Sequence, residues 1–155
     1  MGYRQTVCHC EEIAGSRVAV WHLLTDWAGI IDWMPDGYLQ SLQMEGQGEG
    51  AVRHLVTGKG VQISERLDTM DRSAGIVLLS IIDPLPWGML TYTAKAQLED
   101  AGEENCHLSW CGTFELPAGG QQAEELVILL KKSYAAMFSG IRGELARKND
   151  EKEHD

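Results

Sequence analysis

The feature that most constrains the fold is a change of hydrophobic period near residue 117. Between Tyr38 and Leu116 glycine-rich turn signals and one Asp-Pro-Leu-Pro stretch divide the chain, and the later segments alternate apolar and polar residues. From about 122 to 148 apolar residues recur at helical spacing instead. Alternation is typical of strands with one buried face, and the second pattern is typical of an amphipathic helix. The short turns indicate an antiparallel meander.

The alternation is clearest in the two segments before the helix. Every second residue there is apolar or small, which assigns it to a buried face opposite polar neighbours. This face is predicted to comprise Leu90, Tyr92, Ala94, Ala96, Leu98, Leu108, Trp110, Gly112, Phe114 and Leu116. The helix has a matching apolar stripe of Val127, Leu130, Tyr134, Met137 or Phe138, Ile141 and Leu145. The stripe needs the buried face of the sheet as its partner.

The N-terminal part adds one strand, about Arg4 to Ile13, and two short helices. Gly15-Ser16 can cap the first helix, and the second covers about 28 to 32. The first helix has its apolar positions at Val18, Trp21 and Leu24. The order of elements predicts an α+β fold in which a curved seven-stranded antiparallel sheet grips a long C-terminal helix, with two short helices after the first strand.

Length and charge limit the organisation and the partners. A chain of 155 residues is expected to form one domain, which we place at 1–148, followed by a charged, disordered tail at 149–155. The net charge of −10, with no basic stripe, argues against nucleic acid as a partner. No leader pattern and no apolar run of membrane-span length is present, so we expect a cytoplasmic protein without membrane insertion.

Four cysteines raise the question of a metal site. Cys8 and Cys10 would share one face of the first strand, whereas Cys106 and Cys111 would face opposite ways on a continuous strand. Neither pair has the tight spacing of zinc ligands. We therefore expect free thiols in a reducing cytoplasm, with no metal and no cofactor.

Several short stretches recur along the chain in a characteristic order and spacing. They are Ile13-Ala14, Val20-Trp21, Leu24-Thr25-Asp26, Trp33-Met34-Pro35, Gly48 to Arg53 and Glu65-Arg66-Leu67-Asp68. Together they resemble the helix-grip superfamily, which includes the birch-pollen allergen, START domains and the bacterial polyketide cyclase/dehydrase-like proteins. The resemblance covers about residues 5 to 147 and implies a cavity for an apolar small molecule between sheet and helix. Residues 65–68, 79–82, Tyr92 and 115–117 also have a more distant similarity to plant abscisic-acid receptors.

Two hairpins bear on such a cavity. A turn at Gly58-Lys59-Gly60 sets Arg53 opposite Glu65 and Leu55 opposite Ile63, and the resemblance directs this side inward. The pair either holds strand register or serves a ligand. In the later hairpin Ala94 faces Gly112 and Ala96 faces Trp110. The small residues leave space that either helix side chains or a ligand would fill.

Three functions follow from the resemblance. The first is binding of an apolar or aromatic small molecule with polyketide-type cyclisation or dehydration left open, in which Glu65 would be the base and Arg53 and Tyr92 would hold the enolate oxygen. The second is a carrier of a lipid, quinone or isoprenoid, and the third a protein-interaction module; a homodimer is compatible with each. The candidate ligand-binding residues are Trp33, Leu55, Ile63, Leu79, Ile81, Trp87, Ala94, Trp110, Phe114, Tyr134, Met137 and Phe138.

Overall fold

The structure is a computed structural model that describes residues 2–154, with side-chain surroundings described for residues 2–150. Its elements confirm the predicted α+β architecture and the order of strands and helices. They are β1 (Tyr3–Ile13), α1 (Arg17–Thr25), the short 3-10 helix η1 (Trp27–Gly29), α2 (Ile30–Trp33), β2 (Leu39–Glu45), β3 (Val52–Thr57), β4 (Gln62–Asp71), β5 (Ile76–Ile82), β6 (Thr91–Asp100), β7 (Cys106–Leu116) and α3 (Gln121–His154).

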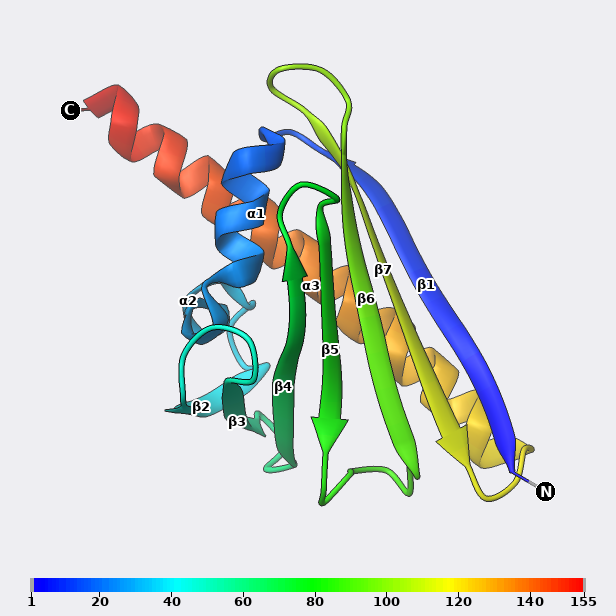
Figure 1. Cartoon of the computed structure of the whole chain (residues 1–155). Coiled ribbons are helices and arrows are strands. Elements are labelled where there is room, and N and C mark those ends of the chain that lie inside the picture. The colour runs from blue at the N-terminus through cyan, green and yellow to red at the C-terminus, as the bar shows by residue number, and fades with distance from the viewer. Residues whose placement is uncertain (1, 155) are drawn as a thin grey trace.

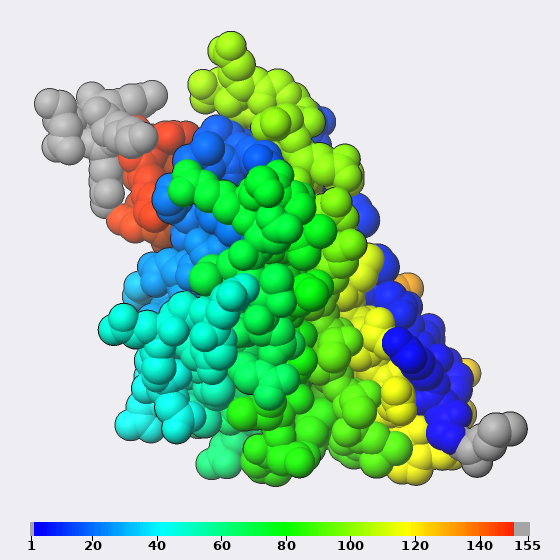
Figure 2. Space-filling model, viewed as in Figure 1, coloured from blue at the N-terminus to red at the C-terminus, as the bar shows by residue number. Residues whose placement is uncertain are grey.

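All seven strands form one antiparallel sheet in the order β1-β7-β6-β5-β4-β3-β2. The meander from β2 to β7 is thus completed by β1, which returns to pair with β7. Helix α3 crosses one face of this sheet diagonally, and α1 and α2 lie beside it near the β2–β4 side (Figure 1). The connection between β6 and β7 projects past the end of the sheet nearest α1 (Figure 2). The fold therefore has two layers, the sheet and the helices that cover one of its faces.

The core lies between the sheet and α3, as the alternation predicts. Tyr92 and Phe114 are buried on the sheet, and Phe138 and Ile141 are buried on the helix. Leu90 is an exception: it is 54% exposed just before β6 begins, and Met89 is buried in its place. The alternation holds only where the chain is paired as a strand.

Helix α1 begins as the sequence predicts, because the Ser16 Oγ accepts a hydrogen bond from the Ala19 N–H at 3.1 Å. Its buried face is different from the one expected. Val18 is 54% exposed, whereas Val20 and Leu23 are buried together with the predicted Trp21 and Leu24. The difference arises because the buried face of this short helix is wider than the single stripe of residues that the sequence analysis assumed.

Helix α3 continues to His154, beyond residue 148 where the sequence analysis ends the domain. In Figure 1 its C-terminal turns extend past the edge of the sheet. Asn149 and Asp150 are helical and exposed, because a helix already formed propagates at little cost into polar residues. The domain boundary at residue 148 stays a prediction. The side chains of 151–155, which belong to the predicted tail, lie outside the described residues.

One prediction about the cysteines is wrong. Cys8 on β1 and Cys111 on β7 are register partners and form a disulfide, with Cα atoms 4.1 Å apart; Cys10 and Cys106 are free. Spacing along the chain could not show this pair, because only the return of β1 to β7 brings the two residues together. Disulfides persist mainly in oxidising compartments, so the cysteines do not support a cytoplasmic location.

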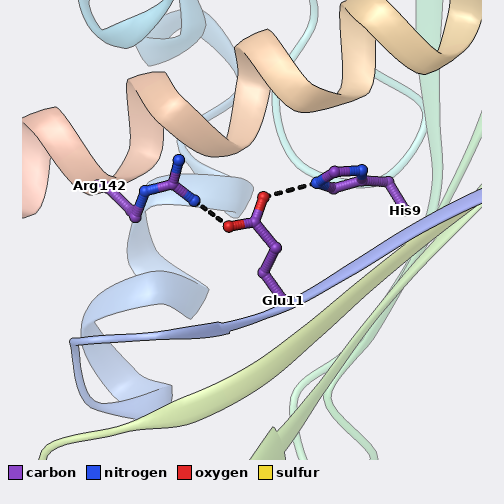
Figure 3. Close-up of polar contacts among 3 residues, drawn as sticks. All are labelled: His9, Glu11 and Arg142. Carbon is purple, nitrogen blue, oxygen red and sulfur yellow. Dashed lines mark hydrogen bonds and ion pairs between the residues drawn. The ribbon is translucent and has the colours of Figure 1, made fainter.

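A polar contact joins the edge strand to the long helix. The Glu11 carboxylate on β1 contacts the guanidinium of Arg142 on α3 and the Nε2 of His9, the latter at 2.5 Å (Figure 3). The His9 ring also meets the Phe138 ring edge-on, with ring centres 4.6 Å apart. These contacts fasten α3 across the first strand.

Among the described helices, none combines the length and apolar character that crossing a membrane requires.

Candidate functional site

A charged pair lies on the inner face of the sheet. The predicted register places Arg53 of β3 opposite Glu65 of β4, and the Arg53 Nε donates a hydrogen bond to the Glu65 Oε1 at 2.7 Å. The Arg53 side chain is only 3% exposed, and that of Glu65 is 15% exposed. Burial lowers the pKa of Arg53 from its ordinary value, and the charge of Glu65 opposes this shift. A buried pair of this kind contributes little net stability compared with apolar residues.

Trp27 of η1 fixes the guanidinium in place. Its indole ring lies 3.6 Å from the Arg53 Cζ, a cation–π contact, and its backbone oxygen accepts a hydrogen bond from the Arg53 Nη1 at 3.2 Å. The Trp27 indole N–H in turn donates to the Glu65 backbone oxygen at 3.2 Å. The turn after α1 therefore holds the pair rigid from one side and leaves further guanidinium N–H groups available.

Two phenols meet in the middle of the core. The hydroxyls of Tyr92 on β6 and Tyr134 on α3 are 2.6 Å apart, and either can be the donor. Burial, together with the neighbouring Tyr134, raises the pKa of Tyr92 well above its ordinary value, and burial raises the pKa of Tyr134 to about 12. Both phenols are therefore neutral near pH 7, and the pair keeps one hydroxyl proton that its own hydrogen bond does not use.

Gly112 makes room for these phenols. A Cβ at this position would lie 1.9 Å from the Tyr134 hydroxyl and 2.5 Å from that of Tyr92. Of the two alternatives for the space opposite Ala94, the structure shows side chains occupying it. Tyr134 supplies the filling from α3, as the packed-core alternative expected.

A small void remains beside the charged pair. It has a volume of about 10 Å³, which is room for about one water molecule. Its walls are Leu24, Trp27, Trp33, Arg53, Val77, Ala96, Trp110 and Met137. Ligand pockets for molecules of drug size enclose about 300 Å³ or more, so a ligand must displace side chains when it binds here.

Two indole side chains line this void, those of Trp33 and Trp110. Among the described residues, the buried side-chain nitrogens and oxygens without a well-aligned hydrogen-bond partner are the indole nitrogens of these two residues. The Trp110 indole still interacts with the Tyr92 and Tyr134 hydroxyls, and this contact opposes the rise that burial causes in the pKa of both phenols. The Trp33 N–H is therefore the clearer exception, and an unpaired buried N–H costs about 1–3 kcal/mol.

The structure gathers the predicted site residues into one core but brings only some of them to the void. Arg53, Trp33, Trp110 and Met137 line it. Ile63 and Trp87 are partly buried against the core, and Trp87, whose carbonyl accepts a hydrogen bond from Gln122, covers the core from the β5–β6 connection. The other predicted residues are buried in the same core: Leu55, Leu79, Ile81, Tyr92, Ala94, Phe114, Tyr134 and Phe138.

Sequence reasoning missed Trp27, which contacts both members of the charged pair, and Leu24 and Val77 as walls of the void. Ala96, which the sequence analysis named as a small residue that leaves space, also lines the void. Trp27 had one usable signal, since it is a large aromatic directly after a predicted helix. Its target could not be inferred, because η1 approaches β3 and β4 only in the folded chain. Within residues 2–150 no three His, Cys, Asp or Glu side chains gather as metal ligands would.

Comparison with known proteins places these features in context. The sequence profile of a family described as polyketide cyclase/dehydrase and lipid transport matches residues 5–146. No curated protein matches the chain significantly.

Solved structures share the fold over nearly the whole chain. The Zhui aromatase/cyclase from Streptomyces sp. R1128 is 19% identical, with a TM-score of 0.81 over 94% of this chain and 96% of its own. Norcoclaurine synthase from Thalictrum flavum, in complex with a transition-state analogue, is 17% identical, with a TM-score of 0.78 over 96% and 98%. The protein XoxI from Bacillus cereus is 26% identical, with a TM-score of 0.74 over 89% and 93%.

Proposed function

Since this chain belongs to the polyketide cyclase/dehydrase and lipid transport family, we propose that it binds an apolar or aromatic small molecule between the sheet and α3. The observation that carries the proposal is the set of buried polar groups beside the void. Arg53, Glu65 and the unpaired indole N–H of Trp33 lie in a core whose other walls are mostly apolar. Apolar walls with a few fixed polar groups are typical of small-molecule sites.

Structural stability alone does not account for this set. A buried ion pair is commonly no better than apolar residues of the same size, and unpaired donors are unfavourable. Groups that reduce stability and lie around one void are therefore better explained by a bound molecule that completes their hydrogen bonds.

Native mass spectrometry of the protein purified from its own host tests the binding. We expect a stoichiometric small-molecule adduct that organic extraction releases. Ala96 lines the void and is 1% exposed, so Ala96→Leu should abolish the adduct. The exposed Ala118→Leu, which adds the same bulk outside the core, should retain it. A folded wild-type protein that never retains an adduct would argue against a carrier and leave transient substrates or protein partners.

Catalysis is the second step of the proposal. Glu65 could take a proton from a carbon next to a carbonyl, while Arg53 and the Tyr92–Tyr134 pair could stabilise the resulting enolate oxygen. The hydrogen bond from the Arg53 Nε to the Glu65 Oε1 would fix the position of the carboxylate that acts as the base. Glu65→Gln should then remove turnover while the ligand adduct persists. Equal turnover in wild type and variant would leave binding without this chemistry.

The alternatives make different predictions. A carrier of a lipid, quinone or isoprenoid should retain an acyl or prenyl chain and keep it in Glu65→Gln. A protein-interaction module should reveal a partner in crosslinking and no adduct. A homodimer, which is compatible with each function, should crosslink to a second copy of the chain with or without an adduct. The cytoplasmic location stays a prediction, which cell fractionation would test.

A further inference from the structure

The free edge of β1 is the longer of the two unpaired edges of the sheet. β1 ends the strand order on one side and pairs with β7 without a register shift over all eleven of its residues, Tyr3–Ile13. It is the outermost strand on its side of the molecule (Figure 1) and lies at the surface (Figure 2). The opposite edge strand, β2, has seven residues, and its pairing with β3 is interrupted between Leu39 and Ser41. Short edge strands and bulges prevent edge-to-edge pairing, and β1 has neither.

The spacing of Cys8 and Cys111 shows which backbone groups face this edge. In antiparallel pairs, residues that exchange hydrogen bonds have Cα atoms about 5.5 Å apart, and residues that do not have them about 4.5 Å apart. The Cα atoms of Cys8 and Cys111 are 4.1 Å apart, so Cys8 directs its N–H and C=O away from β7. The Glu115 carbonyl, which accepts a hydrogen bond from the Leu90 N–H on the β6 side, gives β7 the same alternation. Every second residue of β1, counted from Cys8, therefore offers its backbone groups to another strand.

The charges on the outer face of β1 are complementary to a second copy of the same strand. Arg4 lies four residues before Cys8 and Glu12 four residues after it, and all three residues are exposed and share one face. When two β1 strands pair antiparallel with Cys8 at the centre, Arg4 of each copy lies opposite Glu12 of the other. Within the described residues, neither Arg4 nor Glu12 has an ion-pair partner. Glu11, on the other face, already contacts Arg142.

We propose that the β1 edge is the interface of a two-fold symmetric homodimer, in which β1 pairs antiparallel with β1 of a second copy around Cys8 and the two sheets become one. The residues that face the edge then exchange about ten backbone hydrogen bonds, two for each opposed pair. They are Arg4, Thr6, Cys8, Cys10 and Glu12. The net charge of −10 on each chain opposes association, but at physiological ionic strength charges more than about 8 Å apart are largely screened. The two pairs of Arg4 with Glu12 therefore select this register over its neighbours.

Charge reversal tests the register in sedimentation equilibrium of the whole chain. Arg4→Glu sets two carboxylates opposite each other, and Glu12→Arg sets two guanidinium groups opposite each other, so each variant should weaken the dimer at least about tenfold. An equimolar mixture of the two variants should regain the wild-type affinity, because opposite charges then meet at both positions. Lys59→Glu, in the exposed β3–β4 turn, is the control: it changes the net charge as Arg4→Glu does and should leave the dimer intact.

A proline substitution tests the backbone pairing. The Thr6 N–H faces the free edge, so Thr6→Pro removes a donor from the interface and no hydrogen bond to β7, and proline is tolerated at such edge positions. This variant should be a folded monomer. Thr6→Ala is the matched control, because both variants lose the contact between the Thr6 and Thr113 hydroxyls at 2.7 Å, whereas alanine keeps the N–H and should stay dimeric.

The outcomes separate the interface from its register. A wild-type chain that sediments as a monomer at every concentration would overturn the interface, and so would a dimer that survives Thr6→Pro. A dimer that Thr6→Pro abolishes but neither charge reversal weakens would overturn the register centred on Cys8. Circular dichroism verifies that each variant folds, and the charge reversals alone decide if Thr6→Pro does not. None of these results bears on the small-molecule adduct, so this inference and the proposed function fail separately.

Discussion

The hydroxyls of Tyr92 and Tyr134 lie 2.6 Å apart across the interface between β6 and α3. This hydrogen bond joins the middle of the sheet to the long helix in the buried core. The packing of α3 against the sheet therefore depends on whether these two phenols are protonated. Their raised pKa values mean that the folded state holds these protons more tightly than the unfolded chain.

Stability should consequently fall in alkaline solution. Unfolded tyrosines lose their protons near pH 10, while Tyr134 keeps its proton to about pH 12 and burial raises the pKa of Tyr92 well above its ordinary value. The unfolded state therefore binds fewer protons in this window, and the free energy of unfolding should decrease by about 1 kcal/mol per tyrosine between pH 9 and 11. Urea unfolding of wild type and Tyr134→Phe measures this, and the variant should show a shallower decline. If the free energy of unfolding fell equally steeply with pH in both proteins, Tyr134 would not have the raised pKa.

Adding one methyl group at Gly112 should be destabilising. The new Cβ would overlap the Tyr134 hydroxyl, so Gly112→Ala should lower the free energy of unfolding by about 1–3 kcal/mol. Because the nearest clash is with that hydroxyl, Tyr134→Phe should reduce the cost of the substitution. Gly143→Ala is the control: its Cβ would meet nothing within 4 Å, and it should stabilise α3 by about 0.5–1 kcal/mol. A tolerated Gly112→Ala would show that the core is loosely packed here.

The charged pair should show strong coupling. Glu65→Gln leaves a buried guanidinium without its counter-charge and should cost about 3 kcal/mol or more, whereas the double variant with Arg53→Met should cost less than the sum of its parts. Chemical denaturation of the four proteins gives the coupling energy.

An exposed ion pair on β4 provides a matched control for this double-mutant cycle. Arg66 and Asp68 form an ion pair at 2.6 Å with side chains 46% and 26% exposed. Exposed pairs contribute less than about 1 kcal/mol, so Arg66→Met with Asp68→Asn should show weak coupling. If both cycles gave similar values, the Arg53–Glu65 pair would have to be solvated.

The disulfide should be a measurable part of the stability. Cys8 and Cys111 are separated by 103 residues, so their link restricts the unfolded chain strongly, and its removal should cost about 2–5 kcal/mol. Reductant should lower the urea midpoint of wild type but not that of Cys8→Ser with Cys111→Ser. Cys10→Ser, an exposed free thiol on the same strand, should behave as wild type. A wild-type midpoint insensitive to reductant would mean that the bond is absent in solution.

The contact between Glu11 and Arg142 should have a smaller effect (Figure 3). Both side chains are partly exposed, at 29% and 45%, so Glu11→Gln should cost less than about 1 kcal/mol, and added salt should reduce the difference from wild type. Hydrogen exchange along β1 should rise locally in the variant. Glu12 is adjacent and exposed, so Glu12→Gln should leave hydrogen exchange along β1 unchanged. If Glu11→Gln and Glu12→Gln had equal effects, the contact between Glu11 and Arg142 would not be what protects β1.

Local pattern determined the fold of this protein. A strand with one buried face must alternate, and a helix on that face must have a stripe, so Tyr92, Trp110 and Tyr134 could all be assigned to the interior from their spacing. Turn position fixed the two hairpin registers in the same way, and the structure confirms Arg53 opposite Glu65 and Ala94 opposite Gly112. Neighbours in a hairpin are close in sequence, and for this reason sequence suffices there.

Tertiary structure alone decided the contacts between distant segments. The return of β1 to β7 created the Cys8–Cys111 disulfide, the approach of η1 placed Trp27 under Arg53, and the depth of α3 let Tyr134 fill the space above Gly112. The same packing reduced the expected cavity to a void that holds about one water molecule. The periodic spacing of apolar residues identified which side chains point inward. It could not determine how much space remains between them, because that depends on how closely the sheet and the helix pack.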